Sequence, residues 1–222
     1  MMNERILDLL GEEKFQKIQN CSVLLIGLGG VGGYAFEALI RSGFKNITIV
    51  DFDKFEESNL NRQIYALQQT IGKSKCEVAL QRTHDINPNA QIKFFEEKLT
   101  EEKITNDFIN DYDYIIDACD DGTVKIALIK VCGIAKKKLI SCMGTANRTH
   151  PELLEITTLE KTANDPLAKK IRSAFKNSSF LKTKVVWSGE VPIKQKKLGT
   201  ICSVPMSAGS LLASFVINDL VN

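Results

Sequence analysis

A glycine-rich turn near the N-terminus could form a nucleotide site. Residues 27–32 read Gly-Leu-Gly-Gly-Val-Gly and directly follow the apolar run 22–26. Glycines permit a tight turn whose backbone N–H groups approach a phosphate, and a helix beginning there adds the positive end of its dipole. A second apolar run, 46–50, ends at Asp51, whose carboxylate can accept hydrogen bonds from ribose hydroxyls. The pattern predicts a nucleotide site without specifying the nucleotide.

Taken alone, the glycine turn is typical of dinucleotide-binding proteins, so an NAD(P)-dependent oxidoreductase is the first hypothesis. The alternative without a ligand is a turn that only lets a helix pack closely on a strand. A P-loop is excluded, because Gly72-Lys73-Ser74 resembles its last residues but its first glycine would fall at Leu67.

Charged residues downstream favour a triphosphate over a dinucleotide. Arg62 stands 11 positions after Asp51, and Lys75 follows 13 positions later. Arginine can clamp phosphate oxygens and lysine supplies a point charge, so both cations are expected to be exposed in the site. Asp120 follows a predicted strand and could hold Mg²⁺, although it could also cap the next helix. The combination predicts a nucleoside triphosphate and Mg²⁺ as ligands of the site.

These motifs, in this order, resemble the adenylation domain shared by ubiquitin-activating enzymes and their bacterial relatives ThiF and MoeB. The resemblance implies a set of cofactor-binding residues: Gly27, Gly29, Gly30, Gly32, Asp51, Asp53, Asn59, Arg62, Gln63 and Lys75. It implies catalytic roles for Arg62, Lys75, Asp120 and Arg5, with Asp120 as the metal ligand and Arg5 crossing to the partner's site in a homodimer. Members of this family adenylate a carboxylate, whose oxygen attacks the α-phosphate of ATP as pyrophosphate leaves.

Further positions resemble the TcdA subfamily, the tRNA threonylcarbamoyladenosine dehydratases. They are Arg5, Leu9 and Gly11, Ile86-Asn87-Pro88, the start of the helix at 125–129 and the D-P-L-A-K-K-I-R run at 165–172; the Cys-x-x-Cys zinc pairs usual in ThiF and MoeB are absent. By this resemblance the substrate is a threonyl carboxylate on a modified adenosine of tRNA. After adenylation, the neighbouring carbamoyl nitrogen closes a ring and expels AMP.

Three alternatives stay open. Within the family, the chain could activate the C-terminus of a ubiquitin-like or sulfur-carrier protein, and a sulfur-relay protein is then a candidate partner. Outside it, the chain could be an oxidoreductase or a non-catalytic nucleotide-binding partner of tRNA. Ring closure needs orientation rather than a protein nucleophile. Cys142 and Cys202 are candidate nucleophiles only for a sulfur-transferring relative, because a lone cysteine usually belongs to the core.

Composition indicates an ordinary globular protein with an uneven charge distribution. Of 222 residues, 44% are hydrophobic and 25% charged, and the net charge is only +2. The N-terminal segment holds four acidic residues and no long apolar core, and no apolar stretch approaches the ~20 residues that span a bilayer, so we expect a cytoplasmic protein. Basic residues of the C-terminal third are candidate contacts to tRNA phosphates: Lys169, Lys170, Arg172, Lys176, Lys182, Lys184, Lys194, Lys196 and Lys197.

The predicted elements alternate in a way that brings these residues together. Strands are expected at 22–26, 46–50, 90–95, 112–118 and 138–142, with helices at 33–41, 71–86, 100–110 (capped by Thr100) and 123–136. Helices around Gly11 precede them, and strands at 153–159 and 182–188, a helix at 165–175, a loop at 189–199 and a buried helix at 207–221 follow. The fold class is α/β, a doubly wound, mostly parallel, Rossmann-like sheet with a C-terminal strand and helix extension. We expect one domain over 1–222, with N-terminal helices (1–20), a nucleotide-binding core (21–144) and a substrate and dimer extension (145–222).

Overall fold

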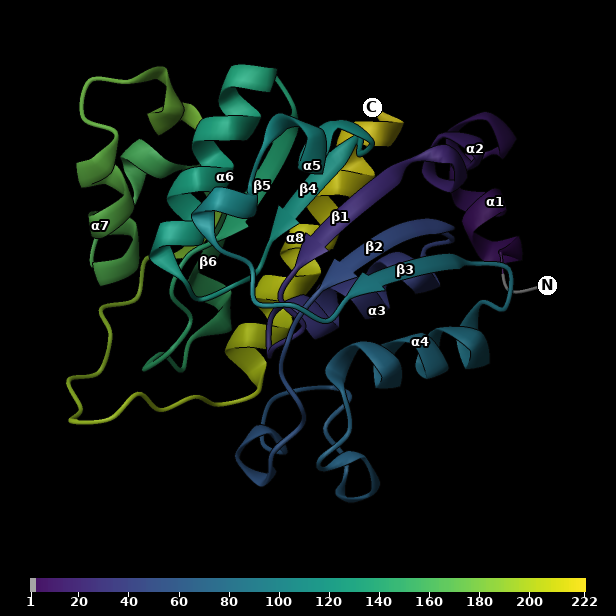
Figure 1. The fold of residues 1–222 in the computed structure, drawn as a ribbon, viewed down its shortest axis with the longest axis horizontal. Coiled ribbons are helices and arrows are strands. Elements are labelled where there is room, and N and C mark those ends of the chain that lie inside the picture. The colour runs from purple at the N-terminus through teal and green to yellow at the C-terminus, as the bar shows by residue number, and fades with distance from the viewer. Residues whose placement is uncertain (1–2) are drawn as a thin grey trace.

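One seven-stranded sheet forms the centre of the molecule (Figure 1). A computed structural model describes residues 3–222, so Met1 and Met2 of the predicted N-terminal segment lie outside the described residues. The strand order is β3-β2-β1-β4-β5-β7-β6, and only β6 runs antiparallel to its neighbour. The strands are β1 Ser22–Ile26, β2 Asn46–Val50, β3 Gln91–Phe95, β4 Tyr114–Asp117, β5 Lys138–Cys142, β6 Leu154–Thr158 and β7 Lys184–Ser188. The predicted doubly wound, mostly parallel sheet is confirmed.

Helices cover both faces of the sheet (Figure 1). They are α1 Glu4–Leu10, α2 Glu12–Asn20, α3 Gly32–Arg41, α4 Lys75–Ile86, α5 Asn106–Asn110, α6 Gly122–Ala135, α7 Pro166–Ala174 and α8 Ser203–Val221. Alternate residues of a strand point to opposite faces. Val23 and Leu25 of β1 accordingly pack with α3 and α8, whereas Leu24 and Ile26 pack with α5 and α6. Burial on both faces explains why the parallel strands read as continuous apolar runs.

Three predicted helix boundaries are wrong. The helix expected at 100–110 is a 3₁₀ turn at Glu101–Lys103 followed by α5, because Thr105, not Thr100, accepts the capping hydrogen bond, from the Phe108 N–H. Helix α4 begins only at Lys75, where the Ser74 hydroxyl accepts from the Glu77 N–H. Helix α8 begins at Ser203 and not at the predicted residue 207. Pro205 does not prevent this earlier start, because proline is tolerated in the first turn of a helix.

The C-terminal extension completes the sheet rather than forming a separate unit. Its strand β7 pairs with β5, and α8 packs along α3. Helix α8 is long and apolar enough to cross a membrane by length and composition alone. Its residues Val204, Ala208, Leu212 and Val216 are nevertheless fully buried in the core. The predicted buried C-terminal helix is therefore confirmed.

A buried carboxylate connects α3 to α4. The Glu37 side chain accepts hydrogen bonds from Arg41 Nε at 2.7 Å, Arg82 Nη2 at 3.2 Å and the Tyr65 hydroxyl at 3.1 Å. Burial by itself would raise the pKa of Glu37, but the hydrogen bonds and charges of Arg82 and Arg41 lower it overall. A carboxyl group whose pKa is lower in the folded protein stabilises the fold above its unfolded pKa of about 4.3. That stabilisation is lost as the pH falls through the lowered pKa of the folded state.

We expect Glu37→Gln to lower the free energy of unfolding by about 1–3 kcal/mol at pH 7, the usual value of hydrogen bonds to a charged group. The variant should also lose less stability than the wild type below pH 4.3, because one carboxyl group with a lowered pKa is gone. Urea unfolding at a series of pH values measures both effects. Glu13→Gln is the control, since the Glu13 side chain is 89% exposed and lies 3.7 Å from Lys17. Identical acid sensitivity in Glu37→Gln and the wild type would contradict the prediction.

Candidate nucleotide and catalytic site

A cleft with a volume of about 1270 Å³ opens where β1, β2, β4 and β5 end. Ligands of open α/β sheets bind at this edge, next to the point where the strand order reverses. The turns after these strands bring most of the predicted site residues to the cleft: Gly27, Gly29, Gly30, Asp51, Asp53, Asn59, Arg62, Gln63, Lys75 and Asp120. Gly32 and Arg5 do not line it.

The glycines of the turn serve two different purposes. Gly27 has a φ of +92°, and a Cβ atom there would lie 2.9 Å from the Ala118 carbonyl oxygen. A Cβ atom on Gly32 would lie 1.7 Å from the Gly27 carbonyl oxygen, so both positions need glycine for packing. Gly29 differs, because apart from its two chain neighbours no described residue comes within 4 Å of its Cβ position. The space in front of Gly29 is part of the cleft and is available to a ligand.

This difference predicts opposite phenotypes for two alanine variants. Gly32→Ala should prevent stable folding, because the Gly27 backbone cannot move far enough to make room for the added Cβ atom. Gly29→Ala should keep the melting temperature of the free protein but weaken ATP binding. An added methyl group at a tight contact costs about 1–3 kcal/mol, so the Kd for ATP should rise about 5- to 150-fold. Thermal unfolding and calorimetric ATP titration measure the pair; unchanged ATP affinity in Gly29→Ala would show that no ligand approaches this turn.

Asp51 is held rigidly at the end of β2. One carboxylate oxygen accepts from the Leu28 N–H at 2.6 Å and the other from the Asp53 N–H at 2.8 Å. Each oxygen has a further lone pair for a ribose hydroxyl. The Lys75 ammonium donates to Asp53 Oδ2 at 2.8 Å and lies 3.9 Å from Asp51 Oδ1. Lys75 is only 4% exposed, so the predicted exposure of this cation is wrong: two carboxylates compensate its charge in the floor of the cleft.

Arg62 and Gln63 retain hydrogen-bonding groups for a ligand. Arg62 is half-buried, and its Nη1 donates to the Ser58 carbonyl at 2.7 Å and to Asn61 Oδ1 at 2.9 Å. Its Nε and Nη2 have no partner within residues 3–222. The buried Gln63 Oε1 likewise lacks a partner among them, and a buried polar atom normally has one. Asn59 instead closes its own 3₁₀ turn, with Oδ1 accepting from the Glu56 N–H at 3.2 Å.

Asp120 and Asp121 have separate roles in the loop between β4 and α6. Asp121 caps α6 by accepting from the Thr123 and Val124 N–H groups, and the bond from Thr123 lowers its pKa. Asp120 is exposed in the cleft and bonds to no other described side chain or backbone group. The alternative that Asp120 caps the helix is therefore wrong. No group of three metal-ligating side chains exists in the described part of the chain. One free carboxylate nevertheless fits Mg²⁺, which takes its remaining ligands from phosphate and water.

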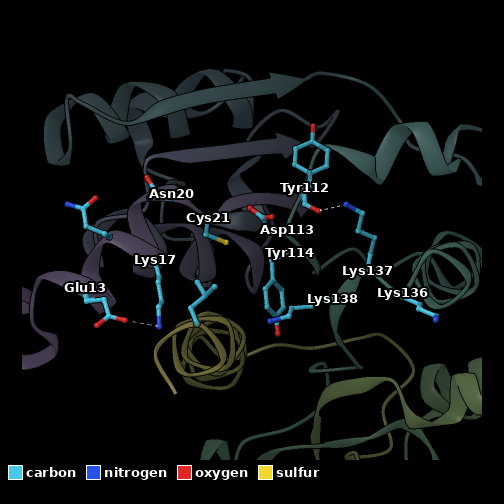
Figure 2. Close-up of a pocket in the computed structure, with 12 residues that line it drawn as sticks. Glu13, Lys17, Asn20, Cys21, Tyr112, Asp113, Tyr114, Lys136, Lys137 and Lys138 are labelled. Atoms are coloured by element: carbon cyan, nitrogen blue, oxygen red, sulfur yellow. Dashed lines mark hydrogen bonds and ion pairs between the residues drawn. The ribbon is translucent and has the colours of Figure 1, made fainter.

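A smaller cleft of about 620 Å³ lies at the opposite edge of the sheet (Figure 2). Three of the lysines that line it already have partners. Lys17 lies 3.7 Å from Glu13, Lys138 lies 2.6 Å from Asp219, and Lys137 donates to the Tyr112 carbonyl at 3.0 Å. None of the predicted site residues lines this second cleft.

Comparisons with known proteins identify the family of this chain. The ThiF family model matches residues 2–216. This chain belongs to the ThiF family. It is 35% identical to the tRNA threonylcarbamoyladenosine dehydratase of Bacillus subtilis over 96% of this chain and 91% of that protein, and 33% identical to its Escherichia coli counterpart over 90% and 78%. The crystal structure of E. coli TcdA in complex with ATP superposes with a TM-score of 0.91 at 31% identity, over 96% of this chain and 91% of that chain.

Arg5 lies far from the cleft of its own chain in this ThiF-family structure. It is exposed on α1, which with α2 precedes β1 at the edge where the strands begin (Figure 1). A catalytic role for Arg5 therefore requires a second copy of the chain, as the resemblance implied.

A buried ion pair that the sequence motifs did not predict lies beneath the cleft. Lys125 of α6 and Asp117 of β4 are both fully buried, with Lys125 Nζ 3.0 Å from Asp117 Oδ2, which also accepts from the Ser141 hydroxyl at 2.6 Å. Burial by itself would lower the pKa of Lys125, but the charge of Asp117 raises it overall. Asp117 also accepts from the Cys119 N–H at 3.2 Å, so the pair anchors the loop that carries Asp120. The acidic residue that ends β4 was the available signal in the sequence.

Cys142, one of the two candidate cysteine nucleophiles, is not activated in this ThiF-family structure. All six cysteines are free. Burial raises the pKa of Cys142 to about 12, so its thiol is protonated at neutral pH. The Cys202 sulfur lies 3.1 Å from the Tyr34 hydroxyl and is half-buried. Nothing in this geometry activates Cys142 as a nucleophile.

Proposed function

We propose that this chain is an ATP-dependent tRNA threonylcarbamoyladenosine dehydratase. The supporting observation is a single cleft that combines a fixed ribose-binding carboxylate, Asp51, with the cations Arg62 and Lys75, in a chain that matches ATP-bound TcdA over 96% of its length. Two cations in one cleft suit the charge of a triphosphate. The proposal makes the chain an enzyme that adenylates a carboxylate on tRNA and then dehydrates the modified nucleoside.

The proposed reaction has two steps, adenylation and ring closure. A carboxylate oxygen of the threonyl group attacks the α-phosphorus of ATP, and the bond to pyrophosphate breaks. The carbamoyl nitrogen then attacks the activated carbonyl carbon and loses its proton as AMP leaves, so the net change in the nucleoside is the loss of one water. Two anions must approach each other in the first step. Arg62 and Lys75 reduce that repulsion and stabilise the charge that develops on the α-phosphate.

Asp120 is the residue that we propose as the ligand of Mg²⁺. Its free carboxylate lies in the same cleft as Lys75 and Arg62. The metal ion would supply Lewis-acid stabilisation of phosphate charge when bound. The chain's own contribution is the orientation of Asp120 by the Asp117–Lys125 pair beneath it.

We also propose that the enzyme is a cytoplasmic homodimer whose partner contributes Arg5, and that exposed lysines near the cleft bind tRNA phosphates. Lys169 and Lys170 are exposed on α7, whose first residues line the cleft. Two of the residues predicted to contact tRNA already have a hydrogen-bond partner within the chain. Arg172 donates to Thr162, and Lys182 donates to Glu160. A sulfur-relay partner belongs only to the alternative in which a carrier protein is activated.

Mass analysis of tRNA nucleosides tests the proposal directly. Modified tRNA incubated with ATP and this protein should yield a threonylcarbamoyladenosine lighter by one water, with release of AMP. A reaction without ATP is the control. Pyrophosphate exchange into ATP that depends on a small protein ending in Gly-Gly, with no change in tRNA, would support the carrier-protein alternative instead. Binding of NAD(P) but not ATP would overturn the whole family of adenylation mechanisms for this chain.

A further inference from the structure

The segment between β7 and α8 forms one wall of the cleft. We call residues 189–202 the strap. Pro192, Leu198, Gly199 and Thr200 of the strap line the cleft. Its lysines at positions 194, 196 and 197 are exposed, and so is Leu198, at 83%. A segment with so little burial of its own must be held in place by contacts at a few positions.

Arg148 makes the largest set of these contacts. It follows β5 and is 2% exposed. Its Nη1 donates to the carbonyl of Ser188 at 3.3 Å and to that of Glu190, at the start of the strap. Its Nε donates to the Gly144 carbonyl at 3.1 Å, and its Nη2 donates to the Asn164 carbonyl at 3.3 Å and lies 3.6 Å from Asp165 Oδ2. One side chain therefore joins three segments of the substrate side of the cleft.

These contacts leave Arg148 no capacity to bind a ligand. A guanidinium group has five N–H donors. The Nε donor and the two Nη1 donors have carbonyl partners, and Nη2 faces a carbonyl and a carboxylate. Arg62 differs, because its Nε and Nη2 have no partner within the described residues. Arg148 thus acts on the cleft through the segments that it holds.

The side chains of Asn147 and Glu190 also hold the strap in place. Asn147 Oδ1 accepts from the Gly199 N–H at 2.6 Å, and the Asn147 backbone exchanges hydrogen bonds with Ile193 and Gly199, each at 2.8 Å. The Glu190 carboxylate accepts from the Thr149 and His150 N–H groups at 3.0 Å. The strap is therefore attached along its length to the loop at 144–150. On the nucleotide side, Asn61 donates to the Thr200 carbonyl at 2.9 Å, and the Cys202 sulfur lies 3.1 Å from the Tyr34 hydroxyl of α3.

We infer that Arg148 is a positioning residue that holds the strap as the tRNA-facing wall of the cleft, and so sets the affinity for tRNA but not for ATP. This inference rests on the proposed function. The chemistry of the strap suits the partner, because its exposed lysines can meet phosphates and its apolar residues can contact unstacked bases of an RNA loop. The nucleotide is held from the other side, by the turns after β1 and β2.

The test compares Arg148→Gln and Arg148→Lys with the wild type. The glutamine variant should raise the KM for modified tRNA about tenfold or more, because lost hydrogen bonds to a charged group weaken the attachment by at least that factor. The kcat and the Kd for ATP should stay close to wild type. Lysine keeps the charge but has fewer donors, and its effect should be intermediate. Arg82→Gln is the matched control, since Arg82 pairs with Glu37 and does not line the cleft.

Trypsin gives a second readout that does not depend on activity. The strap contains three exposed lysines, so its cleavage rate reports how often it leaves the wall. We expect cleavage within 194–197 to be about tenfold faster in Arg148→Gln than in the wild type. Asn147→Gly is the variant to use if Arg148→Gln does not fold. Glycine keeps the positive φ of 57° at this position and removes only the acceptor for Gly199.

The outcomes separate the inference from the proposed function. Unchanged strap cleavage in both variants, or a Kd for ATP that rises as much as the KM for tRNA, would overturn the positioning role. If the wild type turns over no tRNA, the proposed function fails, and the assignment of tRNA to the strap fails with it. Faster cleavage in that case would still show that Arg148 holds the strap.

Discussion

Replacing Lys75 by methionine should lower the rate of tRNA-dependent AMP release by about 10²–10³-fold, the usual effect of removing one group that stabilises transition-state charge. Lys75 lies in the floor of the cleft, with its ammonium 2.8 Å from Asp53 and 3.9 Å from Asp51. A phosphate that enters the cleft meets this cation among carboxylates that would otherwise repel it. Without the ammonium, the two aspartates make the floor of the cleft anionic, and both ATP binding and catalysis should suffer.

The burial of Lys75 adds a stability effect that an exposed lysine would not have. Removing the cation leaves the buried Asp51 carboxylate without its nearest positive charge, whereas Asp53 is 47% exposed and remains hydrated. We therefore expect a cost of about 1–3 kcal/mol in the free energy of unfolding. The double variant Asp53→Asn, Lys75→Met should regain part of this stability, because it removes the repulsion between neighbouring Asp53 and Asp51, but none of the activity. Stability and activity can thus be separated within one pair of residues.

Lys73→Met is the matched control for this experiment. Lys73 belongs to the same Gly-Lys-Ser-Lys run but is exposed and does not line the cleft. Single-turnover release of AMP and urea unfolding should be measured on both single variants. If Lys75→Met released AMP at the wild-type rate, Lys75 would have no role in the mechanism. If Lys73→Met lost as much of the AMP-release rate as Lys75→Met, the number of positive charges would matter and not this position.

The parts of the fold that follow from local pattern were predictable. β1, β2 and β5 have the predicted bounds, because apolar and β-branched runs between turn residues are decisive when both faces of a strand are buried. The helix expected at 100–110 was not predictable in detail. Thr100 and Thr105 are both suitable N-caps, and only the tertiary structure shows which of them accepts a capping bond.

The candidate site was predictable in its residue types but not in its charge balance. Asp51, Arg62, Lys75 and Asp120 come together because each follows the carboxyl end of a parallel strand or the loop after it. The burial of Lys75 depends on its contact with Asp53, which lies 22 residues earlier in the sequence. The residues around Lys75 give no indication of this contact. Lys125 was missed for a similar reason: a lysine on a helix is usually exposed, and only the position of Asp117 in β4 explains its burial. Contacts between distant segments thus account for what the sequence could not reveal.

Asp120→Asn should lower the rate of AMP release by about 10²–10³-fold at a fixed, subsaturating Mg²⁺ concentration. The amide keeps the size and one oxygen acceptor but removes the negative charge that Mg²⁺ prefers. Part of the activity should return at higher Mg²⁺ concentrations if the metal can bind through phosphate and water alone. Titration of the rate against Mg²⁺ measures this shift, and direct Mg²⁺ titration in the presence of ATP gives a readout that is independent of turnover.

Asp121→Asn separates metal binding from helix capping in the same loop. Asparagine is as good an N-cap as aspartate, so this variant should keep α6, which Asp121 caps through the Thr123 and Val124 N–H groups. Its activity and Mg²⁺ dependence should stay near wild type, although the charge at the next position is also removed. A Mg²⁺ dependence in Asp120→Asn equal to that of Asp121→Asn would mean that the local charge, and not the free carboxylate of Asp120, attracts the metal. Asp121 also lines the cleft, but its carboxylate already accepts two capping hydrogen bonds. Only a shift confined to Asp120 agrees with the lack of any partner for Asp120 among residues 3–222.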